Sequence, residues 1–289
     1  MAKENNVIGE RKDLGPVENG PNSTGGQDVD IQSEDQVFGM PFGDIQKLVG
    51  KILVVIIHRS NEGIHHDLAA SIGMWARLGM AVSLIRDPHG GFVEVTRASV
   101  VNTFLEYRER NPNMEYVVMI DADEAIDPSA PLLLARWGKP VVSGIVCGFN
   151  AKHGVFACFT AEDENGMPRF PCAQNGTKLP TEGLIPAYQV GTGLLCVRYD
   201  VFETMRSKGM EPFALDDWTR KQSFIEGVLK KGEDICFSER CEELGFERFV
   251  DASVHGGHQK VVQIAWPNAL LDENLKPEDF VTNRKDYGG

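Results

Sequence analysis

The sequence has little that would build a cross-linked or membrane-spanning protein. Its 289 residues include six cysteines, with no C-x-x-C pair and no regular spacing. Most of these cysteines lie in apolar segments, which favours reduced thiols in a core over a disulfide or zinc framework. The longest purely apolar run, residues 52–57, is far shorter than the roughly 20 residues that a membrane span needs. We therefore expect no membrane span.

Clustered positive charge is also missing. The formal net charge is -13, and no run of Lys or Arg occurs. Because a nucleic-acid surface needs grouped positive charge to neutralise phosphates, a strong nucleic-acid patch is not expected. The first residues lack the charged start and apolar stretch of a secretory signal, which favours a cytoplasmic protein. An acidic protein that binds an anionic ligand commonly does so through a metal ion.

The chain divides by composition into a tail and one α/β domain. Residues 1–45 are rich in Gly, Asn, Asp and Glu and have almost no periodic apolar residues, which predicts a disordered or loosely docked tail. From residue 51 onward, apolar strand-like runs alternate with segments of helical spacing, which is typical of a mostly parallel sheet covered by helices. The predicted strands are 52–57, 81–85, 116–120 and 140–146, and the predicted helices are 64–78, 97–110 and 127–137.

The second half has a more mixed pattern. Asn165-Gly166 between two apolar stretches predicts a hairpin. Further on, the sequence predicts strands at 194–197 and 248–250 and helices at 201–208 and 233–244. We expect a nucleotide-binding half at 46–147, a half at 148–265 that completes a pocket, and a C-terminal tail at 266–289.

Carboxylates follow a buried strand at Asp121-Ala122-Asp123-Glu124. Open α/β sheets bind their ligands at the edge where parallel strands end. Residues two apart in an extended chain point the same way, so Asp121 and Asp123 can face one cation. Carboxylate oxygens suit Mg²⁺ or Mn²⁺, which would bridge the phosphates of a nucleoside diphosphate. The alternative is that both aspartates only cap the following turn.

Two later segments carry further candidates. Glu233 and Asp234 follow Gly232 at the start of a predicted helix, where a capping role alone would explain them. His255 and His258 follow a short predicted strand and flank a pair of glycines, which suits a third metal ligand.

The order of these motifs resembles that of glycosyltransferases with the GT-A fold, and it is similar to glycosyltransferase family 2, including bacterial and phage-type members. The resemblance covers roughly residues 50–260 and implies a Rossmann-like, mostly parallel sheet with a mixed C-terminal half. The motifs are the strand with Ile56-Ile57, Val95-Thr96-Arg97-Ala98, Ile120-Asp121-Ala122-Asp123-Glu124, Val190-Gly191-Thr192-Gly193, Glu233-Asp234, and Asp251 to His258.

The resemblance implies metal and catalytic roles for six of the candidates. Asp123 would bind the metal, and Asp121 would contact the metal or the ribose. His258 would be the distal metal ligand, with His255 as the alternative. Asp234 would take the proton from the acceptor hydroxyl in an inverting reaction, with Glu233 beside it in the catalytic set.

The resemblance also implies contacts with the donor. Arg97 would help to neutralise the diphosphate, and His58, Arg59 and Asp87 would line the pocket for base and ribose. Gly191 and Gly193 would let the backbone approach the donor sugar.

The resulting hypothesis is a hexosyltransferase-like enzyme that uses Mn²⁺ or Mg²⁺ and a nucleoside-diphosphate sugar, with a UDP-sugar as the first candidate. Its acceptor would be a hydroxyl on a glycan, lipid, protein or modified nucleobase. Candidate acceptor contacts, each with core packing as the alternative, are Tyr188, Phe213, Trp218 and Trp266, together with Asp216-Asp217. The competing functions are a metal-dependent phosphohydrolase, a sugar-nucleotide nucleotidyltransferase, and a non-catalytic glycan- or nucleotide-binding module.

Overall fold

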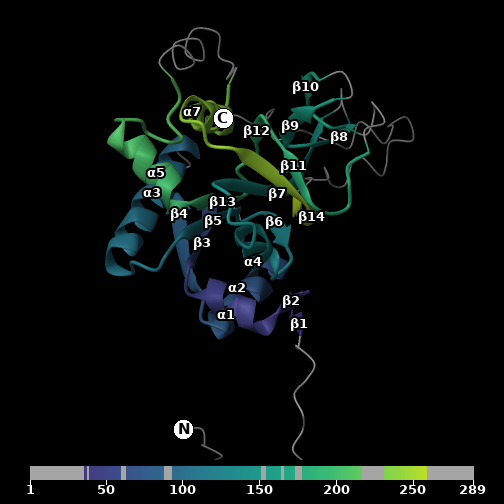
Figure 1. Ribbon diagram of the computed structural model, residues 1–289. Helices are drawn as coiled ribbons and strands as arrows, with labels where there is room; N and C mark the ends of the chain where they lie inside the picture. Colours follow the sequence, from purple (N-terminus) through teal and green to yellow (C-terminus); the bar gives the residue numbers. More distant parts are fainter. Residues whose placement is uncertain are drawn as a thin grey trace, which may run out of the picture. The chain divides into compact units, whose positions relative to one another are not determined.

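The chain folds around a central mixed sheet with helices on both faces (Figure 1). The computed structural model describes residues 36–37, 39–59, 63–87, 93–150, 154–163, 166–172, 178–216 and 231–258. Among these residues, no helix has the length and apolar character needed to cross a membrane. The α/β class predicted from the alternating pattern is confirmed.

The strands of the main sheet lie in the order β11-β14-β7-β13-β5-β3-β4. Strands β4, β3, β5, β7 and β14 run in one direction, while β13 and β11 run against their neighbours. The prediction of a mostly parallel sheet therefore holds for its core. The bounds are β3 Ile52–Arg59, β4 Ala81–Asp87, β5 Tyr116–Asp121, β7 Val141–Asn150, β11 Leu184–Pro186, β13 Leu194–Arg198 and β14 Arg248–His258.

Alternation along β3 divides the core into two layers. Ile52, Val54 and Ile56 pack on one face with helices α1, α2 and α4. Leu53, Val55 and Ile57 pack on the other face with α3, α5 and α7. Because successive side chains of a strand point to opposite faces, a strand that is apolar throughout needs helices on both sides. The bounds are α1 Phe42–Val49, α2 His66–Leu78, α3 Val93–Arg110, α4 Ala130–Ala135, α5 Tyr199–Ser207 and α7 Glu233–Glu243.

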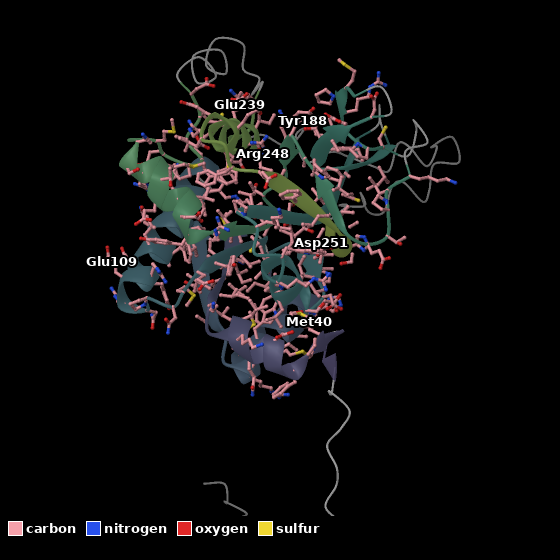
Figure 2. The ribbon with its side chains drawn as sticks, viewed as in Figure 1. Met40, Glu109, Tyr188, Glu239, Arg248 and Asp251 are labelled. Carbon is pink, nitrogen blue, oxygen red and sulfur yellow. The ribbon has the colours of Figure 1, made fainter. Side chains whose placement is uncertain are left out.

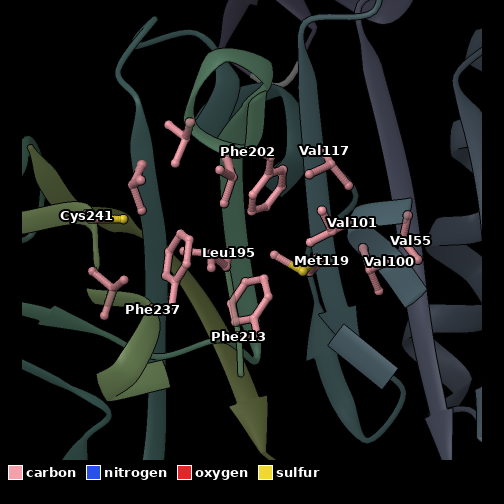
Figure 3. Close-up of a cluster of buried hydrophobic side chains, with 14 of the residues drawn as sticks. Val55, Val100, Val101, Val117, Met119, Leu195, Phe202, Phe213, Phe237 and Cys241 are labelled. Carbon is pink, nitrogen blue, oxygen red and sulfur yellow. The ribbon is translucent and has the colours of Figure 1, made fainter. Parts of the chain in front are cut away.

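Aromatic side chains fill the layer under α5 and α7 (Figure 3). The rings of Phe213 and Phe237 are stacked with centroids 4.6 Å apart, and Phe202 meets both rings at 6.1–6.2 Å. All three side chains are fully buried. Phe213, a candidate for acceptor stacking, is thus part of the core, as the alternative interpretation held.

The folded part of the chain starts inside the segment predicted to be a tail. Strands β1 (Gln36–Val37) and β2 (Met40–Pro41) pair, and α1 begins at Phe42. Met40 and Ile45 are buried against the layer that contains α2 and α4. Two apolar anchors are sufficient to order a short helix, although they are too few to produce a visible periodic pattern.

A smaller sheet, in the order β10-β9-β12, is formed by residues between β7 and β13. Strand β9 (Phe159–Glu162) pairs antiparallel with β10 (Pro168–Arg169) and with β12 (Gln189–Val190). The predicted hairpin is therefore present. Gly166 has φ 73° in its turn, a conformation that favours glycine, and Asn165 lies outside the described residues. Strand β8 (Gly154–Ala157) pairs antiparallel with β7.

We predict that Phe202→Ala lowers the free energy of unfolding by about 3–5 kcal/mol, because it leaves a cavity between three packed rings. Leu84→Ala is the control, since Leu84 is 56% exposed on β4 and its truncation is expected to change stability by about 0.5 kcal/mol or less. Urea denaturation of both variants measures the difference. Equal losses in the two would contradict the layered core.

Candidate functional site

Charged groups meet at the edge where the parallel strands end. Strand β5 ends at Asp121, the chain turns through Ala122 and Asp123, and β6 (Glu124–Ile126) runs back toward β14. The turn is tied to the end of β3, because the Ala122 amide donates to the Ile57 carbonyl at 2.9 Å. This is the position at which open α/β sheets hold ligands.

Asp121 forms an ion pair with the buried Arg97. The Nη2 of Arg97 lies 2.8 Å and 3.1 Å from the two oxygens of Asp121. Alternation explains the pairing, because Val117 and Met119 face the layer that contains α3, and Asp121 is next in that series. Arg97 is only 1% exposed, whereas the Asp121 side chain is 29% exposed. The arginine therefore fixes one side of the carboxylate and leaves the other side open to solvent.

Glu233 lies near the same guanidinium. Its Oε1 is 3.9 Å from Arg97 Nε and accepts a hydrogen bond from Thr192 Oγ1 at 3.2 Å. Burial raises the pKa of Glu233, the charge of Asp234 adds to this, and Arg97 opposes it. The guanidinium of Arg97 thus lies close to both Asp121 and Glu233, which are more than a hundred residues apart in the chain.

Asp234 is the second residue of α7, next to Glu233. Its Oδ1 accepts a hydrogen bond from the Ile235 amide at 2.8 Å, a local contact of the capping kind. Burial raises the pKa of Asp234, while backbone hydrogen bonds and Arg97 lower it in part. A carboxylate with a raised pKa is a stronger base when ionised, so capping and proton transfer are compatible roles for this residue.

Glu124 is a member of the site that the sequence reasoning left without a role. It is 1% exposed, and its two oxygens lie against Gly193 and Gly256. A Cβ on Gly193 would come within 3.1 Å of Oε1, and one on Gly256 within 3.1 Å of Oε2. The two glycines therefore make room for this carboxylate. The signal was a third acid directly after the Asp121–Asp123 pair, but the sequence alone could not match this acid to the distant Gly193 and Gly256.

Gly191 is required by packing within the protein. A Cβ at this position would lie 2.6 Å from the carbonyl oxygen of Cys158. Ser143 lies beside the same loop, since its hydroxyl oxygen is 3.2 Å from the Gly191 carbonyl and 3.1 Å from the Leu194 carbonyl, as well as 2.8 Å from the Gly144 carbonyl. Of the two glycines predicted to admit a donor sugar, Gly193 is the one that borders the carboxylates.

The end of β14 runs beside the turn that holds Asp123. Strand β14 does not end at Val250 as predicted but continues to His258, and His258 pairs in register with Glu124. His255 is exposed and pairs in register with Ile145 of β7. The side chain of His258 lies outside the described residues. Backbone pairing nevertheless brings the histidine segment and the aspartate turn together.

A buried carboxylate shapes this part of β14. Asp251 is fully buried (Figure 2). It accepts hydrogen bonds from Trp137 Nε1 at 2.7 Å and from Ser253. The register with β7 shifts between Asp251 and His255. The irregularity redirects the strand, so the residues after it pair with β6 as well as with β7.

The predicted nucleotide contacts lie at the ends of two neighbouring strands. Register pairs His58 with Arg86 and Arg59 with Asp87 across β3 and β4. His58 is half-buried, whereas the side chains of Arg59 and Asp87 lie outside the described residues. Their proposed role in a base and ribose pocket stays a prediction.

The predicted acceptor contacts are only partly described. Tyr188 is half-buried and donates its hydroxyl to Glu162, and Asp216 forms an ion pair with Lys231 at 2.9 Å. Asp217, Trp218 and Trp266 lie outside the described residues.

Three donors of the metal-binding type come together at His65, His66 and Asp67. One ligand atom from each lies within 4.8 Å of the others. This group was not among the predicted metal ligands. It begins at the same edge of the sheet, because the His65 amide donates to the Ala122 carbonyl at 2.9 Å.

Comparison with known proteins gives only distant likenesses. No model of a known family matches the sequence, and no curated protein matches it. Solved structures with a similar fold include A197 from STIV, with 13% identity over 72% of this chain and 85% of that one, and a TM-score of 0.42. A second is GalNAc-T7 with UDP, GalNAc and Mn²⁺, with 11% identity and a TM-score of 0.40. A third is a nucleoside-diphosphate-sugar pyrophosphorylase from Vibrio cholerae, with 11% identity and a TM-score of 0.35.

The coverage of these structures differs. The match to GalNAc-T7 covers 72% of this chain but only 44% of that structure, so the chain spans less than half of that protein's length. The match to the pyrophosphorylase covers 72% of this chain and 76% of that one. Because every TM-score is below 0.5, the fold assigned to the chain rests on its own topology.

We predict that Asp234→Asn becomes more stable relative to the native chain as pH rises from about 4 to 7. A carboxyl group whose pKa is raised on folding keeps its proton more readily in the folded state. The native chain therefore loses stability as pH rises from the ordinary aspartate value of 3.8 through the raised pKa, whereas the amide does not titrate. Urea denaturation at several pH values measures this. A pH-independent difference would contradict the assigned burial.

Proposed function

We propose that the chain is a metal-dependent glycosyltransferase of the GT-A type. It would move a sugar from a nucleoside-diphosphate sugar, with a UDP-sugar as the first donor to test, to an acceptor hydroxyl. The observation that carries the proposal is the joining of Asp121 and Glu233 by one buried guanidinium at the carboxyl edge of the sheet. That contact supports the proposal, because it places Asp121, a candidate metal ligand, near Glu233, which is next to the candidate base Asp234 in the chain.

The donor atoms present suit a hard divalent cation. Asp121 has one side open to solvent, Asp123 is half-buried in the turn after it, and both offer carboxylate oxygens. Mg²⁺ and Mn²⁺ prefer such oxygen ligands. Asp121 and Glu233 share Arg97, so two negative groups meet one positive group there, and a bound cation would offset the excess. Asp121, Asp123 and the histidine segment 255–258 would hold the ion.

The proposed reaction gives one role to the metal-binding residues and another to Asp234. When bound, the divalent ion would stabilise negative charge on the departing diphosphate. Arg97 would hold Asp121 in place, so that the site needs little rearrangement during the reaction. Asp234 would accept the proton of the acceptor hydroxyl as it attacks, which inverts the configuration at the sugar. Its raised pKa strengthens it as a base, and the adjacent Glu233 would remain fixed by Thr192 and Arg97.

We predict that UDP-glucose with Mn²⁺ raises the melting temperature of the native chain, whereas Asp123→Asn abolishes the shift. A ligand at about 100 times its dissociation constant stabilises the folded state by about 2.7 kcal/mol. Glu109→Gln removes an exposed acid on α3 and is expected to keep the shift. A thermal-shift panel of UDP-, GDP-, CMP- and TDP-sugars, with and without Mn²⁺, makes the measurement. No shift with any donor, or an equal shift in Asp123→Asn, would sink the proposal.

We also predict that Asp234→Asn lowers kcat about 10²–10⁴-fold while donor binding persists, because only proton removal is lost. Release of UDP from the donor, with water or a simple glycoside as acceptor, provides the rate. Glu243→Gln, an exposed acid at the other end of α7, is the matched control.

Two further assays on the same protein separate the competing functions. Formation of UTP from UDP-glucose and pyrophosphate would identify a nucleotidyltransferase. Hydrolysis of simple phosphate esters without nucleotide preference would identify a phosphohydrolase. Either result, with no sugar transfer, would replace the glycosyltransferase assignment.

A further inference from the structure

The start of α2 brings two imidazoles and one carboxylate together outside the proposed catalytic set. Each carboxylate oxygen of Asp67 lies near one of the two rings. Its Oδ1 is 3.3 Å from His66 Nε2, and its Oδ2 is 3.7 Å from His65 Nδ1. The ring centroids of the two histidines are 4.3 Å apart. All three donor groups therefore surround one small volume.

The two distances from Asp67 to the histidine nitrogens are close to the spacing of ligands around a tetrahedral ion. Zinc binds histidine nitrogen and carboxylate oxygen at about 2.0–2.2 Å, so two ligands of one ion lie roughly 3.4 Å apart. The distances of 3.3 Å and 3.7 Å are close to that value before any ion is bound. Three ligands leave the remaining position for water.

We propose that His65, His66 and Asp67 form a binding site for a borderline divalent ion such as Zn²⁺, Ni²⁺ or Cu²⁺. Imidazole nitrogen favours these ions, whereas carboxylate and carbonyl oxygens favour Mg²⁺ and Mn²⁺. The donor set therefore separates this site from the oxygen-rich site at Asp121 and Asp123. The inference does not depend on the proposed glycosyltransferase activity.

One ligand is already fixed by the fold. The His65 side chain is only 7% exposed, and its Nδ1 accepts a hydrogen bond from the Asp67 amide at 3.2 Å. An ion at Nδ1 would replace that long hydrogen bond with a coordinate bond. His66 and Asp67 are 82% and 58% exposed, so they can adjust to the ion without disturbing the core.

The partial positive charge at the start of α2 lowers the affinity for a cation only weakly. The first turn of a helix carries partial positive charge, which lowers the affinity for a cation by about twofold to fivefold. Loss of a ligand or of a group that orients one costs about 10-fold or more in metal affinity. The metal affinity that three ligands provide therefore exceeds the loss of affinity caused by the helix dipole.

Packing connects this cluster to the segment that contains and follows the candidate metal ligands Asp121 and Asp123. Helix α2 donates three hydrogen bonds to that segment: His65 N to Ala122 O, Ser71 Oγ to Ile126 O, and Trp75 Nε1 to Pro128 O, at 2.9, 2.9 and 2.6 Å. The ion would therefore be bound by His65, whose backbone amide donates a hydrogen bond to Ala122 in the turn between Asp121 and Asp123.

The test is calorimetric titration of Zn²⁺ into the full chain carrying Asp123→Asn, so that the oxygen-rich site does not contribute. We expect saturable binding that His66→Ala weakens about 10-fold or more. His65→Asn should weaken it to a similar extent with an unchanged melting temperature, because asparagine can still cap the helix. Mn²⁺ in place of Zn²⁺ should show no saturable binding in the same background.

Asp67→Asn should also weaken Zn²⁺ binding, and Asp44→Asn should not. Asp44 is the matched control, since it is an exposed aspartate in the first turn of α1. The proposal is overturned if Zn²⁺ fails to bind in the Asp123→Asn background, or if it binds equally well after His66→Ala and His65→Asn. Failure of the glycosyltransferase assignment would leave these outcomes unchanged.

Discussion

The buried contact between Arg97 and Asp121 is the interaction on which the site depends. An arginine that is 1% exposed has lost nearly all of its water, so it is tolerated in the protein only beside negative groups. Asp121 and Glu233 supply them from β5 and from the first turn of α7. Loss of either carboxylate would leave a buried charge with less compensation, which ties the geometry of the two motifs together.

The strand pattern made most of the fold predictable. Apolar runs placed β3, β4, β5 and β13 within a few residues of their observed bounds, and helical spacing placed α2, α3, α5 and α7. The ordering of α1 could not be predicted, because it depends on two buried residues, Met40 and Ile45, and on a layer built by distant parts of the chain. The full length of β14 was missed because its pairing with β6 and the carboxylate of Asp251 sustain it past an irregularity.

The sequence indicated where several candidate residues lie in the fold but not which of them contact one another. Carboxylates after a buried strand indicated the location of Asp121 and Asp123, and alternation along β5 explains why Asp121 faces Arg97. The role of Arg97 as a link between two carboxylates required the position of α7, which no local pattern contains. Glu124 was missed for the same reason, since glycines far along the chain determine what surrounds it.

The central claim is that Asp121 and Asp123 hold a divalent cation against a diphosphate at the carboxyl edge of β5. A crystal structure with UDP and Mg²⁺ tests it most directly. The account predicts an ion about 2.1 Å from a carboxylate oxygen of Asp123 and equally close to a diphosphate oxygen. An ion and a nucleotide bound elsewhere, with Asp123 turned away from both, would contradict it.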